Sequence, residues 1–249
     1  MTTELLGVIV TFLLTVLLAI PIGKYIAKIF NGEKTFLDFL NPIERCIYRI
    51  CGINPTKSMT WKEYLIAMLT INCLWFVYGF LMLIFQSHLP LNPDGNPDQT
   101  PDLAFNSIIS FVTNTNLQDY SGETGATYLT QLFVFTFLQF TSAAAGIACL
   151  IALFNAFKEK STSNLGNFWS IFIKSITRLL LPLSIVLAIV LALNGTPTGF
   201  KGKDTIVTLQ GDTQQVSRGP AAGMITIKQL GTNGGGYFSA NSSAPLRKS

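Results

Sequence analysis

The sequence LAFNSIISFVTNTN at residues 103–116 is the stretch that decides the fold of this chain. Its first ten residues are mostly apolar, but they are too few to cross a bilayer, which takes about 20 residues at a rise of 1.5 Å each. Its last four residues are small and polar. The same order recurs in AAGMITIKQLGTNGGG at residues 221–236. We therefore predict two half-helices, each followed by a polar loop at membrane depth.

The composition places the chain among integral membrane proteins. Of its 249 residues, 49% are hydrophobic and only 12% are charged, and the mean hydropathy is +0.44. Soluble domains carry about 25% charged residues. The net charge of +4 does not indicate a nucleic-acid partner, because the basic residues cluster beside apolar segments, where they report topology. Membrane lipid is the expected surrounding, with no nucleic acid.

Four segments are long and apolar enough to span a membrane. They comprise residues 5–30, 61–85, 128–154 and 168–193. Seven Lys and Arg residues lie between positions 24 and 62, whereas none lies between 86 and 157. The positive-inside rule then predicts an external N-terminus, cytoplasmic loops near 31–60 and 158–167, and external segments at 86–126 and 194–249.

The external segments share one plan. In the first, residues 103–112 form the half-helix, with Asp102 at the N-cap position, and a polar run follows it. In the second, residues 204–216 are expected to form a hairpin, and residues 221–230 the half-helix. The order of span, half-helix, polar hairpin and span is complete over residues 61–154, and it begins again at residue 168. We interpret this order as an internal repeat.

The two polar loops are the candidate cation site. A half-helix presents the partial negative charge of its free carbonyls at its C-terminal end, and successive loop carbonyls can replace an ion's hydration shell. Neither loop contains a carboxylate, which favours a weakly hydrated monovalent ion over calcium. A flexible loop or a simple helix cap is the alternative interpretation. The candidate ligands are Thr113, Asn114, Thr115, Asn116, Thr232, Asn233, Gly234, Gly235 and Gly236.

Other polar positions have weaker signals. Ser142 begins the small-residue run SAAAG, which is expected to pack closely against a neighbouring helix. Gln131 and Gln139 lie within a span and are expected to face the bundle interior. No nucleophile motif, phosphate loop or phosphorylatable aspartate motif is identified, so the chain is predicted to be non-catalytic. The sequence GTNGGG lacks the lysine and hydroxyl residue of a nucleotide loop.

Several stretches resemble one known family, the A subunits of Kdp-type potassium-transporting ATPases. Two of them, FVTNTNLQDYSGET at 111–124 and LGTNGGGYF at 230–238, contain the predicted loops. The others are LPLNP at 89–93, SAAAGIA at 142–148, LGNFW at 165–169 and NSS at 241–243. The resemblance runs from the first span to about Ser243.

The resemblance implies an all-α integral membrane fold related to potassium channels. Repeats of span, pore half-helix, filter and span follow an extra N-terminal span, one repeat complete and one incomplete. The expected parts are residues 1–60 for the first span and its cytoplasmic loop, 61–157 for the first repeat and 158–249 for the second. Such a pore needs four repeats, so the chain is expected to be the N-terminal portion of the subunit.

The resemblance also implies a function. Subunits of this kind lie in the bacterial inner membrane, bind potassium outside through filter carbonyls and pass it to a P-type ATPase catalytic subunit, with small accessory membrane subunits. Potassium is then the transported ligand, and no organic cofactor is expected. The alternatives are a potassium channel or Trk-type symporter subunit without an ATPase, and a structural scaffold with glycine linkers. ATP-dependent uptake separates the pump from the channel, and potassium-dependent thermal protection separates binding from a scaffold.

Overall fold

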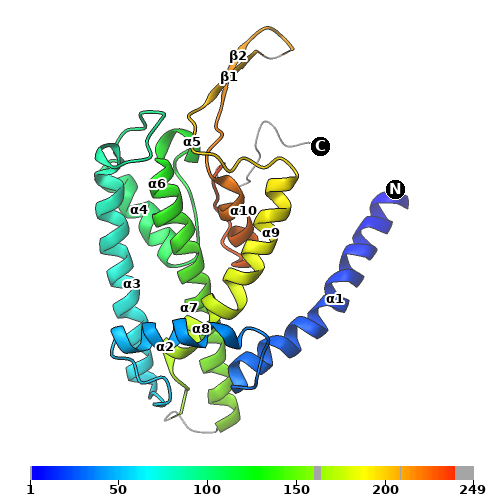
Figure 1. The fold of residues 1–249 in the computed structure, drawn as a ribbon, viewed down its shortest axis with the longest axis vertical. Helices are drawn as coiled ribbons and strands as arrows, with labels where there is room; N and C mark the ends of the chain where they lie inside the picture. The colour runs from blue at the N-terminus through cyan, green and yellow to red at the C-terminus, as the bar shows by residue number, and fades with distance from the viewer. Residues whose placement is uncertain (1, 160–163, 208, 239–249) are drawn as a thin grey trace. The chain divides into compact units, whose positions relative to one another are not determined.

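The computed structural model describes residues 2–159, 164–207 and 209–238. The NSS stretch at 241–243 therefore lies outside the described residues. The chain divides into two compact units, Met1–Ile53 and Asn54–Ser249 (Figure 1). Four helical segments are long and apolar enough to cross a membrane, which confirms the prediction of an all-α membrane protein.

The first unit consists of one long apolar helix and two short helices. Helix α1 (Thr2–Asn31) contains Pro21 and exposes its apolar side chains throughout its candidate span. Proline is tolerated inside such helices. The 3₁₀ turn η1 (Asp38–Leu40) and helix α2 (Asn41–Ile50) follow. The second unit contains the other three spans.

Capping and proline chemistry explain the helix boundaries in the second unit. Thr60 and Glu63 form a reciprocal capping box at the start of α3 (Trp61–Ile84). A wide π turn, η4 (Ser175–Leu180), precedes α9 (Leu181–Leu193). The first turn of α9 contains Pro182, which cannot donate a helical hydrogen bond. The three spans are α3 (Trp61–Ile84), then α6 (Tyr128–Thr130) with η3 (Gln131–Thr136) and α7 (Phe137–Glu159), and finally α8 (Phe168–Lys174) with η4 (Ser175–Leu180) and α9 (Leu181–Leu193).

Both predicted half-helices are helices in the structure. Helix α10 spans Ala221–Leu230, as predicted, and lies beside α9 (Figure 1). Helix α4 spans Pro101–Val112, two residues more than predicted. The prediction of Asp102 as the N-cap is wrong, because Thr100 is the N-cap and Pro101 suits the first helical position. Asp102 instead lies in the first turn, where a negative charge favours the helix dipole.

The remaining elements lie in the two segments that the sequence analysis predicts to be external, the first between α3 and α6 and the second after α9. Two one-turn helices, η2 (Gln86–His88) and α5 (Gly122–Gly125), lie in the first of them. In the second, strands β1 (Asp204–Val207) and β2 (Thr213–Val216) pair antiparallel, with Asp204 opposite Val216. This hairpin confirms the prediction for residues 204–216, and Figure 1 shows it projecting from one end of the second unit.

An aromatic core holds the short helices against the spans. Phe111 of α4 and Phe135 of η3 are fully buried, with ring centroids 4.6 Å apart. The ring of Tyr120 stacks on Phe135 at 5.2 Å. Tyr237, just beyond the second loop, is fully buried in the same cluster. The core therefore fixes both ends of the first loop and the far end of the second.

Candidate cation site

The two predicted loops leave their helices in the same way. We call residues 113–116 the first loop and residues 232–236 the second loop. After each helix, three successive N–H groups donate to earlier backbone carbonyls. The first of these groups belongs to Thr113 after α4 and to Gly231 after α10. In both series the acceptors lie four, three and five residues earlier in the chain. The N–O distances are 3.0, 3.4 and 2.9 Å after α4, and 2.7, 3.4 and 3.0 Å after α10. Two different sequences thus form the same helix ending.

Positive φ angles recur at the second and fourth residues after each helix. They are 63° and 52° at Asn114 and Asn116, and 55° and 105° at Thr232 and Gly234. Alternation of the sign of φ turns successive peptide groups toward one side of the chain. The backbone equivalence pairs Asn114 with Thr232, so it is displaced by one residue from the alignment of the shared Thr-Asn dipeptides. The sequence pattern alone did not indicate this displacement.

The two loops lie against each other. The side-chain Nδ2 of Asn114 donates to the carbonyl of Gly231 at 3.2 Å, and Nδ2 of Asn233 donates to Oδ1 of Asn114. A Cβ atom at Gly234 would lie 3.5 Å from the carbonyl oxygen of Thr115. The structure therefore brings together residues that are about 120 positions apart in the sequence.

In the part of the chain that the structure describes, most of the loop carbonyls accept no hydrogen bond from a backbone N–H group. The carbonyl of Gly235 accepts a bond of 2.7 Å from Nε2 of the buried Gln139. Among the described residues, no backbone N–H group donates to the backbone carbonyls of the other eight candidate ligands. Carbonyls without donors are the groups that can replace the hydration shell of a bare cation. Eight loop carbonyl oxygens therefore remain candidate ligands, whereas the carbonyl oxygen of Gly235 is held by Gln139.

Helix α7 supports the loops from behind. Ser142 Oγ donates to Oδ1 of Asn114 at 2.9 Å and accepts from Nδ2 of Asn233 at 3.3 Å. A Cβ at Gly231 would lie 3.0 Å from the Cβ of Ala143. The run of small residues that begins at Ser142 thus packs against the end of α10, and its hydroxyl group joins the two loops. The polar residue Gln139 faces the interior, as its sequence position indicated.

Ser110 supports the first loop and was missed by the sequence analysis. Its carbonyl accepts from the N–H groups of Thr115 and Asn116 at 2.9 and 3.0 Å. Its Oγ accepts from the N–H of Leu117 at 2.6 Å. One residue in the last turn of α4 therefore holds three consecutive backbone amides. A serine three residues before the loop was the available signal.

Residues beyond the first loop connect it to the second. The Oε1 atom of Gln118 accepts from the N–H of Gly236 at 2.7 Å. Burial raises the pKa of Tyr120 well above its ordinary value, so its ring enters the core as a neutral phenol. Asp119 and Glu123 accept hydrogen bonds from Asn106 and Ser121. Both carboxylates thus have local partners.

Buried amides hold together the segment between α3 and α6, which the sequence did not indicate. Gln86 is fully buried, and its Nε2 donates to the carbonyls of Pro97 and Gly125 at 2.6 and 3.0 Å. Its Oε1 accepts from Thr127 N and Thr130 Oγ1 at 3.2 and 2.9 Å. Four bonds satisfy this side chain completely. The segment between α3 and α6 is therefore fixed by hydrogen bonds of a buried side chain.

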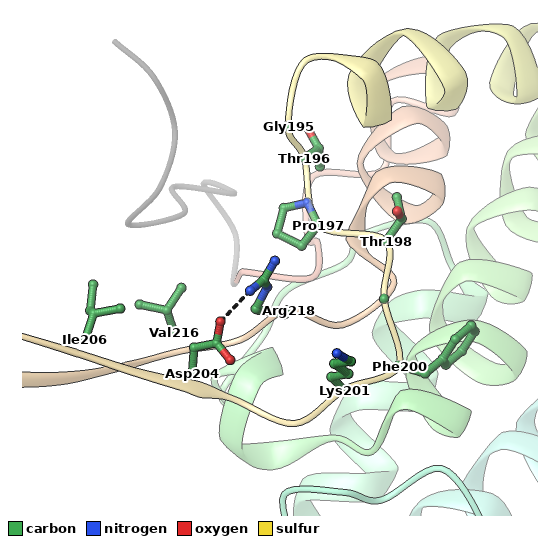
Figure 2. A pocket seen from close by; sticks show the side chains of 11 residues that line it. Gly195, Thr196, Pro197, Thr198, Phe200, Lys201, Asp204, Ile206, Val216 and Arg218 are labelled. Carbon is green, nitrogen blue, oxygen red and sulfur yellow. Dashed lines mark hydrogen bonds and ion pairs between the residues drawn. The ribbon is translucent and has the colours of Figure 1, made fainter.

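A separate hollow of about 620 Å³ lies at the base of the hairpin (Figure 2). Arg218 pairs there with Asp204 at 2.5 Å, and Lys201 also lines the hollow. None of the nine candidate ligands lines it. Two positive side chains against one carboxylate do not favour a cation, so we do not assign the ion site to this hollow.

The described residues contain no cluster of three or more His, Cys, Asp and Glu side chains that could hold a metal ion. A cation at the loops would therefore be bound by carbonyl, amide and hydroxyl oxygens. Such ligands suit a weakly hydrated ion, whereas calcium sites use carboxylates.

Comparison with known proteins gives a consistent result. The family described as potassium-transporting ATPase A subunit (KdpA) matches residues 9–248. The chain is similar to proteins named potassium-transporting ATPase potassium-binding subunit. It is 58% identical to that of Flavobacterium psychrophilum over 247 residues and 55% identical to that of Bacteroides thetaiotaomicron over 246 residues, each covering 99% of this chain. The subunit of Alicyclobacillus acidocaldarius is 45% identical over 96% of the chain. The chain spans 43% of the length of each of these relatives.

Proposed function

Because the chain belongs to the family of potassium-transporting ATPase A subunits, we propose that its two loops supply part of a selective potassium site. The observation that supports this proposal most strongly is the set of eight loop carbonyls that accept no hydrogen bond from a backbone N–H of the described residues, on two loops that lie in contact. Potassium gives up its hydration shell more readily than smaller ions, and ordered carbonyls can replace that shell. The ligand set is completed by oxygens outside the described residues.

The helices contribute electrostatically to the same site. Both α4 and α10 end at a loop, so the partial negative ends of two helix dipoles lie next to the proposed ion position. The nine candidate residues line the site, and Gly235 acts through its small size while its carbonyl is held by Gln139. Gln139 and Ser142 are positioning residues, because they contact loop atoms and not the ion.

The proposed partners supply the energy. A P-type ATPase catalytic subunit would hydrolyse ATP, with small accessory membrane subunits in the same complex, and this chain would be a non-catalytic subunit. The names of the relatives support this assignment, and no observation favours the channel or symporter alternative. Rubidium-86 uptake into membrane vesicles with the complete complex should require ATP. Equal uptake without ATP would favour a channel.

We propose that the complex lies in the bacterial inner membrane with the N-terminus of this chain outside. The charge pattern and the four apolar helices support this topology. Two cysteine reporters test it in a variant whose four native cysteines are replaced by serine. Gln210→Cys at the hairpin turn should react with an impermeant thiol reagent in intact cells, and Lys34→Cys should react only after permeabilisation. The opposite labelling would reverse the orientation.

A matched pair of glycine variants in the complete complex tests the potassium site. Gly234 has a φ of 105°, which a side chain rarely adopts, whereas a Cβ at Gly223 of α10 would meet no atom within 4 Å. Gly234→Ala should strain the loop by ~1–3 kcal/mol, which corresponds to an affinity loss of about 5- to 150-fold. Gly223→Ala should retain the original affinity. Rubidium-86 binding, in competition with potassium and with sodium, measures both. Unchanged binding in Gly234→Ala would remove Gly234 from the site.

A further inference from the structure

Helix α2 in the first unit exposes an apolar face that no described residue covers. Ile43, Cys46, Ile47 and Ile50 recur at steps of three and four residues, so they share one side of the helix. Ile43 and Ile50 are 54% and 79% exposed, Cys46 is exposed and Ile47 is half-buried. Four neighbouring residues of this kind form a continuous apolar strip, which a helix in water would not favour.

Two exposed aromatic residues precede the helix in the chain. Phe36 is 76% exposed and Phe39 is 69% exposed. The ring of Phe36 stacks on Tyr25 of α1, with ring centroids 5.3 Å apart. This contact fixes the linker beside the last turns of the long apolar helix. We call the six residues Phe36, Phe39, Ile43, Cys46, Ile47 and Ile50 the α2 face.

The other two sides of α2 differ from this face. Glu44 and Tyr48 are buried, so that side packs against protein. Arg45 and Arg49 are exposed on the third side, and neither forms an ion pair with any residue that the structure describes. The helix thus has a protein side, an apolar side and a cationic side. An interfacial helix needs this division, with apolar residues toward the acyl chains and cations at the headgroups.

The position of α2 along the chain indicates what covers the α2 face. Helix α1 is exposed and apolar over its whole candidate span, as expected for a helix in lipid. Only nine residues separate its end at Asn31 from the start of α2 at Asn41, and the Tyr25–Phe36 stack keeps part of that linker beside α1. Helix α2 therefore lies near the level at which α1 leaves the hydrocarbon.

From these observations, we propose that the α2 face is a lipid-binding surface that inserts into the membrane interface, with Arg45 and Arg49 bound to anionic phospholipid headgroups. Cations near an anionic leaflet gain about a fivefold preference each. The charge pattern of the sequence places this segment on the cytoplasmic side, where anionic lipids attract basic segments. This proposal does not depend on the ion site, so the two can fail separately.

Power-saturation EPR in nanodiscs tests where the face lies. In the complete complex, a spin label is placed at Cys46 after Cys51, Cys73 and Cys149 are replaced by serine, and a second label is placed at Arg49→Cys. The label at Cys46 should collide more with oxygen than with a water-soluble nickel complex, and the label at position 49 should show the reverse. Nickel access at Cys46 would mean a solvated face. Shielding of Cys46 from both reagents would mean a protein partner. Either result would overturn the proposal.

Lipid composition tests the headgroup claim. Nanodiscs of phosphatidylcholine are compared with nanodiscs that contain phosphatidylglycerol, at low and high salt. The oxygen access at Cys46 should increase with phosphatidylglycerol and decrease with salt, and the double variant Arg45→Gln with Arg49→Gln should lose most of this dependence. Lys62→Gln on α3, an exposed cation outside α2, is the matched control and should keep it. A lipid dependence that is the same in both variants would overturn the assignment to Arg45 and Arg49.

Discussion

The first and second loops reach the same backbone geometry by different means. In the first loop, asparagines occupy the positions with positive φ, and Ser110 of the preceding helix holds three amides. In the second loop, Gly234 has the largest of these positive φ angles. Two side chains from other elements support this loop, namely Gln139 of α7 and Gln118 beyond the first loop. The backbone amides of the first loop are therefore held mainly by its own helix, whereas the backbone of the second loop also depends on side chains from other elements.

This difference predicts where each loop is vulnerable. Substitutions that affect the first loop should matter through one local hydrogen bond, which contributes about 0.5–1.5 kcal/mol. Substitutions in the second loop should matter through steric overlap or the loss of a distant partner. The following variants, made in the complete transporter, test this contrast from the largest expected effect to the smallest.

Gly235→Ala should cause the largest loss. A Cβ at Gly235 would overlap the carbonyl oxygen of Asn116 and lie 2.8 Å from Oε1 of Gln118. The two loops would have to separate, so we expect rubidium-86 uptake to fall at least a hundredfold, while Gly223→Ala in α10 leaves it intact. Folding is checked by size-exclusion chromatography. A well-folded Gly235→Ala protein with normal uptake would show that the loops do not need this contact.

Gln139→Leu should have the next largest effect. It leaves the buried carbonyl of Gly235 without a donor, at a cost of about 1–3 kcal/mol, and it frees that oxygen to turn. We expect the potassium affinity to fall about tenfold and the preference over sodium to decrease. Competition binding with rubidium-86 measures both quantities. Unchanged selectivity, with only a lower melting temperature, would limit Gln139 to a stabilising role.

Ser110→Ala should be milder. The variant loses only the bond from Leu117 N to the hydroxyl, while the Ser110 carbonyl still accepts from Thr115 and Asn116. A loss of about 1 kcal/mol corresponds to a fivefold change in affinity at most. An effect as large as that of Gln139→Leu, in the same binding assay, would contradict the view that the first loop supports itself.

A substitution of Asp98, which lies between α3 and α4, should have the smallest effect. Asp98 accepts a hydrogen bond of 2.7 Å from Ser87 N, which lowers the pKa of its carboxyl. This contribution to stability is present above the ordinary carboxyl pKa and is lost as the pH falls through the lowered value. Asp98→Asn should therefore flatten the acid side of the melting-temperature profile. A profile identical to that of the parent protein would exclude Asp98 as a source of acid sensitivity.

The sequence predicted the elements better than their contacts. The bounds of α10 follow from an apolar run between Pro220 and Gly231, and the hairpin follows from the Gly211-Asp212 turn. The start of α4 was misjudged because Asp102 and Thr100 are both acceptable caps, and only the position of Pro101 decides between them.

The pairing of the two loops was beyond any local pattern. The contacts of Asn114 with Gly231 and Asn233 join residues that only the packed spans bring together. The same holds for Gln139, because a span glutamine indicates an interior side chain without naming its partner. The sequence therefore predicted the two loops and their candidate ligands, which stay a prediction, but it did not predict the hydrogen bond between Gln139 and the carbonyl of Gly235.

Carbonyl chemical shifts give the most direct test of the claim that these loops bind potassium. Solid-state NMR is performed on the complete transporter in lipid, with ¹³C-labelled carbonyls at Thr115, Gly234 and Gly235, first in potassium and then in sodium. We predict that the shifts of Thr115 and Gly234 change with the ion, whereas that of Gly235 stays constant because Gln139 holds its oxygen. Constant shifts at Thr115 and Gly234, or the largest change at Gly235, would contradict the account.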